Sequence, residues 1–153
     1  MKITIPNTGE LELQTVILDL NGTLTIRGIL IEGVQERLEK LKQKGFSLFL
    51  FSGDTRGTAK SLADTLGLQY VYASTGEEKR RASLELNPAT CVAIGNGFID
   101  VPLFREVGLS IATLQAEGVH REALKEADIT VPSIVDALDV LLDEQTLIST
   151  LRA

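Results

Sequence analysis

Short apolar runs alternate with amphipathic segments along almost the whole chain. The run Phe46–Phe51 (FSLFLF) is brief and apolar at most positions, which is typical of a strand buried on both faces of a sheet. Gly33–Lys44 instead places Val34, Leu38 and Leu41 at helical spacing, and Gly45 follows as a helix end. Further strands are expected at Val16–Asp19, Tyr70–Ala73, Cys91–Gly95, Leu109–Ala112 and Ile129–Val131, and further helices at Thr55–Leu66, Glu77–Leu86, Ile99–Val107, His120–Glu126 and Ser133–Leu142.

This alternation predicts an α/β fold. Repeated strand–helix units favour a mostly parallel sheet with helices on both faces, which is a doubly wound, Rossmann-like arrangement. Ile3–Ile5 and Glu10–Leu13 flank the turn residues Asn7-Thr8-Gly9 and predict a small N-terminal hairpin. No repeat, low-complexity stretch or linker interrupts the chain, and its length of 153 residues suits one domain. We therefore expect a single domain over residues 1–153.

Composition narrows the class of partner. A net charge of −6 and a pI near 4.8 argue against nucleic acid, which requires a basic face. The apolar runs are shorter than the roughly 18 residues of a membrane helix, and the N-terminus lacks a signal-peptide pattern, so we expect a cytoplasmic protein without a membrane partner. One cysteine (Cys91) and one histidine (His120) allow neither an internal disulfide nor a histidine-rich metal site. Any metal should therefore be a hard cation that prefers oxygen ligands.

Three of the expected strands end in polar residues. The first ends at Asp19, the next is followed by Ser52-Gly53, and a later one leads into Gly95-Asn96-Gly97 with Asp100 beyond it. In sheets of this kind, ligands bind outside the carboxyl ends of the strands, where the strand order reverses. The three strand ends would face one crevice if these strands are neighbours.

The residues at these strand ends suit phosphoryl transfer. An aspartate such as Asp19 can attack phosphorus and form an aspartyl phosphate. Ser52 and Gly53, with the helix N-terminus after them, offer hydrogen-bond donors to a phosphate. Lys79, near the start of the next helix, can stabilise the charge of the transferring group. Mg²⁺ requires one or two carboxylates together with phosphate oxygens, which Asp19 and Asp100 can supply.

Taken in chain order, the segments around Asp19, Ser52, Lys79 and Asp100 resemble the four motifs of the haloacid dehalogenase superfamily. The most similar members are the small soluble proteins related to the phosphorylation domain of P-type ATPases. Asp19–Leu24 (DLNGTL) is similar to the first motif, with Asp19 as the nucleophile and Thr23 among the phosphate-binding residues. Ser52 and Lys79 stand at the second and third motifs, which bind phosphate, and Gly95–Asp100 (GNGFID) resembles the acidic fourth motif.

The resemblance implies Mg²⁺ as the cofactor, held by Asp19, the backbone carbonyl of Asn21, Asn96 and Asp100. It also reveals two departures from the family pattern. Family phosphatases usually carry an aspartate at the catalytic position of Asn21, where it protonates the leaving group and later activates water. An amide does neither, and the loss of a general acid–base group costs about 10²–10⁴ in rate. Asn96 replaces another commonly acidic residue, which leaves Asp100 as the expected main side-chain ligand and predicts weaker Mg²⁺ binding.

The spacing between the motifs predicts an open, capless crevice. The Gly33–Lys44 helix fills most of the gap before the second strand, and the stretch from Ser52 to Lys79 holds one helix and one strand. Neither gap accommodates the cap domain with which relatives enclose small substrates and exclude water. Ile26–Ile31 can form at most a short flap hairpin. We expect a phosphorylated small molecule or a phosphoprotein as partner, and a crevice that is open unless a second subunit of a homo-oligomer covers it.

Three functions of different classes fit the sequence. The first is an Mg²⁺-dependent phosphohydrolase that acts through an aspartyl phosphate on Asp19 and is slow on unactivated phosphomonoesters. The second is a non-catalytic module that binds phosphate or a phosphometabolite, and the third is a regulator that docks on another protein through the crevice. Asn21 stands in place of the usual acid–base aspartate, whereas the nucleophile Asp19 is present. Because Asp19, Ser52 and Lys79 all remain suited to catalysis, the sequence favours the enzyme.

Overall fold

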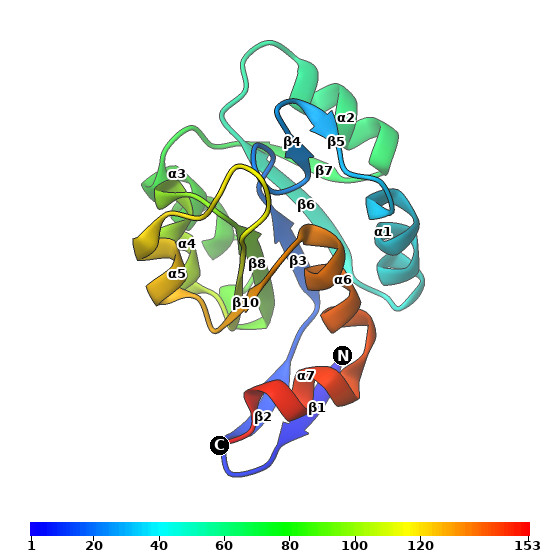
Figure 1. Cartoon of the computed structure of the whole chain (residues 1–153), viewed down its shortest axis with the longest axis vertical. Coiled ribbons are helices and arrows are strands. Elements are labelled where there is room, and N and C mark those ends of the chain that lie inside the picture. The colour runs from blue at the N-terminus through cyan, green and yellow to red at the C-terminus, as the bar shows by residue number, and fades with distance from the viewer.

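The computed structural model describes residues 1–153 and has a six-stranded sheet at its centre (Figure 1). The strand order is β10-β9-β8-β3-β6-β7, and every neighbouring pair is parallel. The strands are β3 (Thr15–Leu18), β6 (Ser47–Ser52), β7 (Gln69–Tyr72), β8 (Cys91–Gly95), β9 (Leu109–Thr113) and β10 (Ile129–Val131). The predicted α/β, doubly wound fold is confirmed.

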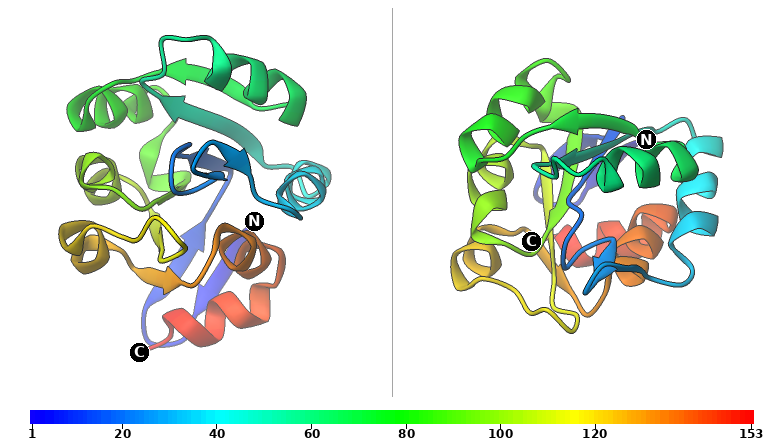
Figure 2. Two further views of the ribbon diagram at one scale, coloured as in Figure 1. Left: turned by 45° about the horizontal axis from the view of Figure 1, so that its top comes forward. Right: turned by 90° about the horizontal axis from the view of Figure 1, so that it is seen from above.

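Helices cover both faces of the sheet (Figure 2). One face carries α1 (Val34–Gln43), α2 (Thr58–Leu66) and α6 (Ile134–Leu142), and the other carries α3 (Gly76–Leu84), α4 (Val101–Glu106) and α5 (Arg121–Glu126). Side chains alternate between the two cores along β3, since Val16 and Leu18 join the larger cluster and Ile17 joins the smaller one. This burial on both faces explains why the strands are continuous apolar runs.

Two small hairpins stand apart from the central sheet. The predicted N-terminal hairpin is present as β1 (Lys2–Ile5) and β2 (Gly9–Glu12), and the short flap as β4 (Thr25–Ile26) and β5 (Ile29–Leu30). A last helix, α7 (Glu144–Leu151), packs against β1 and was not predicted. Leu147 is its one fully buried residue, and Ile148 and Leu151 pack against the same core as partly buried side chains.

Two helices begin more than one residue later than predicted. Helix α2 starts at Thr58 rather than Thr55, because Gly57 takes a left-handed φ of 80° and separates the preceding loop from the helix. The Asp54 carboxylate accepts the N–H groups of Arg56 and Ala59 and so closes this loop onto the first turn. Helix α4 starts at Val101, after a single 3₁₀ turn η2 (Phe98–Asp100), and a similar turn η1 (Pro88–Thr90) precedes β8.

The strand order places the carboxyl ends of β3, β6 and β8 together. From β3 the chain passes to β6 on one side, and it later returns to place β8 on the other side of β3. Leu18, the last residue of β3, is level with Leu50 of β6 and Ile94 of β8. Only the flap and α1 lie between β3 and β6, so no cap domain is inserted there. None of the helices combines the length and the hydrophobicity that crossing a bilayer requires.

Candidate active site

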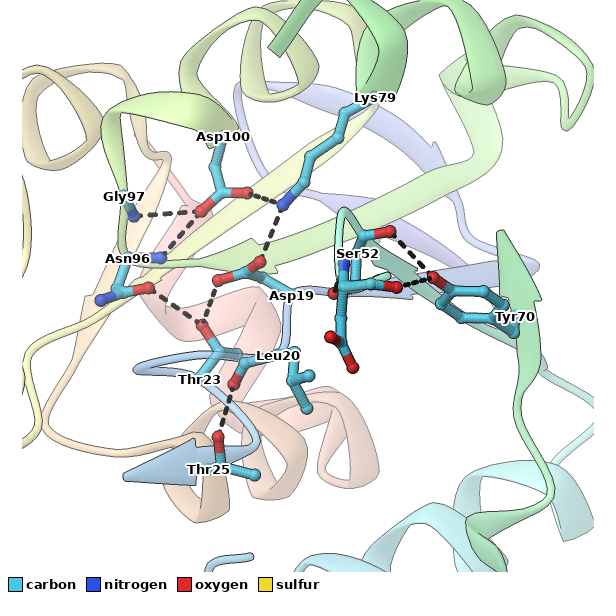
Figure 3. Close-up of polar contacts among 11 residues, drawn as sticks. Asp19, Leu20, Thr23, Thr25, Ser52, Tyr70, Lys79, Asn96, Gly97 and Asp100 are labelled. Carbon is cyan, nitrogen blue, oxygen red and sulfur yellow. Dashed lines mark hydrogen bonds and ion pairs between the residues drawn. The ribbon is translucent and has the colours of Figure 1, made fainter. Parts of the chain in front are cut away.

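Asp19, Lys79 and Asp100 form a buried ionic triad at the carboxyl ends of the strands (Figure 3). The Lys79 Nζ donates to Asp19 Oδ1 and to Asp100 Oδ1, each at 2.8 Å. The side chains of Lys79 and Asp100 are 2% exposed, whereas that of Asp19 is 13% exposed. An ammonium has three N–H donors, so one donor of Lys79 remains for a further acceptor. Asp19 is the member of the triad that solvent can reach.

The start of α3 is fixed by local hydrogen bonds, which set the position of Lys79. The Thr75 hydroxyl accepts the N–H of Glu78, and Glu78 Oε2 accepts the N–H groups of Thr75 and Ser74. This capping box satisfies donors that a helix N-terminus otherwise leaves free. Gly76 allows the close approach of α3 to α4, because a Cβ there would lie 2.8 Å from a Pro102 side-chain carbon.

The triad raises the pKa values of Asp19 and Lys79. Burial, and then the charge of Asp100, raise the pKa of Asp19 to about 6, against the lowering effect of Lys79. Burial alone would lower the pKa of Lys79, but the ion pairs with Asp100 and Asp19 outweigh it and raise that pKa above its usual range. Lys79 therefore remains charged. The ionised form of Asp19 is disfavoured by its burial and by the nearby charge of Asp100.

Asp100 organises the turn after β8. Its Oδ2 accepts the N–H groups of Asn96 and Gly97 at 3.1 and 3.0 Å, while Oδ1 accepts from Lys79. Gly95 has to be glycine here, since a Cβ would collide with the Asp100 carboxylate. With both oxygens engaged, Asp100 holds Lys79 and the turn in place. Its role as a metal ligand stays a prediction.

Thr23 and Asn96 lie beside the second oxygen of Asp19. The Thr23 hydroxyl is 3.4 Å from Asp19 Oδ2 and 3.4 Å from Asn96 Oδ1. The Asn96 Nδ2 donates to the carbonyl oxygen of Gly118 at 3.0 Å, which fixes the orientation of the amide and leaves Oδ1 on the side of Asp19. Thr23 is fully buried behind Asp19, so its predicted contact with phosphate stays a prediction.

Hydrogen-bond donors without partners surround an open cavity of about 720 Å³ in front of Asp19. The backbone N–H groups of Asn21 and Gly53, which both line this cavity, donate to no acceptor in the chain. The Ser52 hydroxyl accepts the N–H of Asp54 at 3.2 Å and keeps its own hydrogen for a ligand. Together with the free donor of Lys79, these groups can hold the oxygens of a phosphate next to the carboxylate.

Oxygen donors suitable for Mg²⁺ lie at the same place. Asn21, which lines the cavity, has a carbonyl oxygen that accepts no hydrogen bond, whereas the neighbouring carbonyls of Leu20 and Gly22 do. Asp19 Oδ2 and Asn96 Oδ1 add a carboxylate and an amide oxygen. These are the ligand types that Mg²⁺ prefers, and no group of three or more His, Cys, Asp or Glu side chains competes with them elsewhere. The residues present fit this ion.

The sequence did not indicate three residues that support the site. Tyr70 donates its hydroxyl to the carbonyls of Ser52 and Asp54 at 3.2 and 3.1 Å, so it holds the loop after β6. Thr113 and Gln115 donate to the carbonyl oxygen of Gly22. Thr113 is the last residue of β9 and Gln115 follows it. The rule that the carboxyl ends of parallel strands meet at one edge could have identified both as residues of the site.

The raised pKa of Asp19 predicts that Asp19→Asn stabilises the metal-free protein at alkaline pH. Folding moves this pKa from 3.8 to about 6, so the folded state binds more protons between these values and the wild type loses stability as the pH rises through them. The variant lacks this loss and should exceed the wild type by up to about 3 kcal/mol above pH 7. Denaturant unfolding with a chelator at pH 5 and pH 8 measures the difference. An advantage that does not grow between these two pH values would contradict the raised pKa.

Comparisons with known proteins agree with the fold and the motifs. The sequence profile of haloacid dehalogenase-like hydrolases matches residues 26–108, more than half of the chain. A soluble P-type ATPase-like phosphatase of Methanocaldococcus jannaschii is 33% identical over 123 residues, which are 77% of this chain and 45% of that protein. The chain thus spans about half the length of this relative.

Solved structures share the fold at low sequence identity. One is the 3-deoxy-D-manno-octulosonate 8-phosphate phosphatase of Moraxella catarrhalis in complex with magnesium, phosphate and the sugar acid, with a TM-score of 0.70, 18% identity and coverage of 92% of this chain and 94% of that one. The cobalt-bound deoxy-D-mannose-octulosonate 8-phosphate phosphatase of Haemophilus influenzae has a TM-score of 0.70 at 16% identity, covering 90% and 97%. The chain belongs to the haloacid dehalogenase-like hydrolase family.

Proposed function

We propose that the chain is an Mg²⁺-dependent phosphohydrolase that acts through an aspartyl phosphate on Asp19 and is slow on unactivated phosphomonoesters. The observation that carries this proposal is the cradle of free donors around an accessible carboxylate. The N–H groups of Asn21 and Gly53, the Ser52 hydroxyl and Lys79 all border the cavity that Asp19 faces. The phosphatases among the relatives support the same class of reaction.

In the first step, a carboxylate oxygen of Asp19 bonds to phosphorus as the bond to the leaving oxygen breaks. The donors of the cradle stabilise the charge on the three other oxygens. Lys79 stays protonated because two carboxylates face it, so it contributes charge and no proton. Mg²⁺, held by Asp19, the Asn21 carbonyl and Asn96, would supply further positive charge to the phosphate when bound.

The proton for the leaving group is the part that the chain lacks. Asn21 lines the cavity next to Asp19 and has no acidic hydrogen to give. The second step, in which water attacks phosphorus and Asp19 leaves as a carboxylate, lacks a base for the same reason. Aryl and acyl phosphates, whose leaving groups depart without a proton, are therefore the expected best substrates.

A rapid-quench assay tests the proposal. Purified protein is given an acyl phosphate, an aryl phosphate and an alkyl phosphate, with Mg²⁺ or with a chelator, and acid-stable phosphoprotein is measured alongside free phosphate. We expect turnover of the first two substrates with Mg²⁺ only, and accumulation of phosphoprotein. Neither turnover nor phosphoprotein with any substrate would contradict the enzyme. Heat released on titration with inorganic phosphate would then favour the binding module, for which the missing acid is the supporting observation.

Mutation can distinguish the contributions of Asn96 and Asp100 to Mg²⁺ binding. If Asn96 holds Mg²⁺, Asn96→Ala should raise the Mg²⁺ concentration for half-maximal turnover by at least about 10-fold, since even outer-shell partners of a metal are worth about 10–100-fold. Asp100→Asn should instead lower the maximal rate, because Asp100 fixes Lys79 and the turn after β8. Activity titrated against Mg²⁺ in both variants decides between them. A larger shift of the half-maximal concentration in Asp100→Asn would make Asp100 the main ligand.

A further inference from the structure

The Gln115 side chain connects the turn after Asp19 to helix α6. It lies in the loop formed by residues 114–120, between β9 and α5. Its Nε2 donates to the carbonyl oxygens of Gly22 at 2.7 Å and Thr23 at 2.6 Å. Its Oε1 accepts the backbone N–H of Ile134 at 3.1 Å. A single amide thus joins the turn at Gly22 to the start of α6 at Ile134, more than a hundred residues further along the chain.

The surroundings of Gln115 permit only one orientation of its amide. Both N–H donors face carbonyl oxygens, and the amide oxygen faces an N–H donor. A flipped amide would place oxygen against two carbonyl oxygens and leave the N–H of Ile134, in the first turn of α6, without an acceptor. The contact is therefore specific for a glutamine, which is both donor and acceptor at this length.

The two ends of this contact are held in different ways. Helix α6 places four residues in the larger core (Ile134, Ala137, Leu138 and Leu141) and is fixed by them. The turn after Asp19 contains Gly22 with a φ of +76°; Leu20 and Leu24 anchor its two sides in the same core, and hydrogen bonds hold the residues between them. Thr113 adds a second, longer contact of 3.4 Å to the Gly22 carbonyl. The rigid helix therefore restrains the turn through Gln115.

The loop that carries Gln115 also holds other parts of the site. Gly118 accepts from Asn96 Nδ2, and the His120 N–H donates to the Asn96 carbonyl at 2.8 Å. Glu117 accepts the N–H of Arg27 in the flap at 2.9 Å. The loop thus contacts the segments after β3 and β8 and the flap, while Ser52 and Lys79 lie outside its contacts.

We infer that Gln115 is a positioning residue for the nucleophile. By binding the Gly22 and Thr23 carbonyls, it holds the turn in the conformation that leaves the Asn21 carbonyl unpaired and Asp19 beside Lys79. This inference rests on the proposed phosphohydrolase activity. It concerns the geometry of attack more than the capture of phosphate, because the donors of Ser52, Gly53 and Lys79 do not touch Gln115 and only the Asn21 N–H lies in the turn that Gln115 holds.

Three variants and a matched control test the inference. Gln115→Glu conserves shape but turns an oxygen toward two carbonyls, and Gln115→Met conserves length without polar atoms. Thr113→Val removes only the longer contact. Gln145→Glu makes the same charge change on the exposed side of α7, which packs on β1. The measurements are the rate of phosphoprotein formation from an aryl phosphate in a rapid-quench assay, inhibition by inorganic phosphate, and amide hydrogen exchange of the segment 19–25 without added metal.

Gln115→Met should lower the rate of phosphoprotein formation by about 10-fold, since a misplacement of about 1 Å can cost about 10²-fold. Gln115→Glu should lower it further, although glutamate is the closer match in shape, and Thr113→Val should lower it less. Inhibition by phosphate should change by less than about twofold, as expected when an interaction acts on the transition state rather than on binding. Exchange of the 19–25 amides should accelerate in both Gln115 variants and stay unchanged in Gln145→Glu.

Two results would overturn the positioning role. Either the rate of phosphoprotein formation stays unchanged in both Gln115 variants, or this rate is lower in the methionine variant than in the glutamate variant, which is the order that a packing role predicts. If the wild type shows no turnover at all, the proposed function fails. The exchange data alone then decide whether Gln115 restrains the 19–25 segment. Unchanged exchange of the 19–25 segment in the Gln115 variants would then refute the restraint.

Discussion

Asp19→Ala is expected to abolish turnover, with a loss of about 10³-fold or more, the scale on which the removal of a catalytic nucleophile acts. The structure supports this because Asp19 is the one exposed carboxylate of the triad, and Asp100 is buried with both oxygens engaged. Asp54 also lines the cavity, but its two oxygens accept the N–H groups of Arg56 and Ala59. The measurement is turnover of an aryl phosphate with saturating Mg²⁺, together with acid-quench trapping of phosphoprotein.

The control for this experiment has to separate chemistry from folding. Asp64→Asn removes a carboxylate from the exposed side of α2, where Asp64 pairs only with Lys60, and should leave turnover unchanged. Asp19→Asn should fold and remain inactive, since an amide is no nucleophile toward phosphorus. Mg²⁺-dependent turnover that persists in pure, folded Asp19→Ala would exclude an aspartyl phosphate at this position.

Asn21→Asp is expected to raise turnover of an alkyl phosphate by up to about 10²-fold, the usual contribution of a placed general acid. The fold should tolerate it, because the Asn21 side chain is exposed and makes no hydrogen bond that a carboxyl would break. An aryl phosphate should gain less, since its leaving group needs no proton. The added negative charge should offset part of the gain by repelling the phosphate and raising the pKa of Asp19 further.

The accumulation of phosphoprotein gives an independent measure of this effect. The wild type should accumulate it, and Asn21→Asp should accumulate less, because the new carboxylate can activate the attacking water. Asn87→Asp makes the same change before the amino end of β8, opposite the site, and serves as control. Peptide mass analysis must confirm that the wild-type Asn21-Gly22 amide is intact. No gain on the alkyl ester, with no phosphoprotein in the wild type, would favour the binding module.

The fold could be predicted because its strands are buried on both faces. Each apolar run is then continuous, and the glycines and prolines between runs mark the ends of the elements. Helix α7 was not predicted, although Leu147, Ile148 and Leu151 recur at helical spacing, because only Leu147 of these eight residues is fully buried. Its start depends instead on the Asp143 carboxylate, which accepts the N–H groups of Gln145 and Thr146.

The candidate site could be predicted only as a set of residues. The motifs bring Asp19, Ser52, Lys79 and Asp100 to one edge, and the structure places them around one triad and cavity. Their pairing was not predictable, because the sequence does not show whether Asp100 faces solvent or Lys79. The contacts of Thr23 and Gln115 are also tertiary, since each depends on how closely two loops approach. Gly22 illustrates this, because a Cβ there would collide with the Asn96 amide.

The contact between Tyr70 and the loop after β6 allows intrinsic tyrosine fluorescence to report on the site. The chain has no tryptophan and only two tyrosines, so its near-ultraviolet emission comes mainly from Tyr70 and Tyr72. The hydroxyl of Tyr70 is hydrogen-bonded to the carbonyls of Ser52 and Asp54, on either side of Gly53, so its fluorescence should change when that loop moves. Tyr72 is 54% exposed, and its emission can be removed with Tyr72→Phe. Anion capture between the strand ends can thus be followed by tyrosine fluorescence in real time, with no label attached.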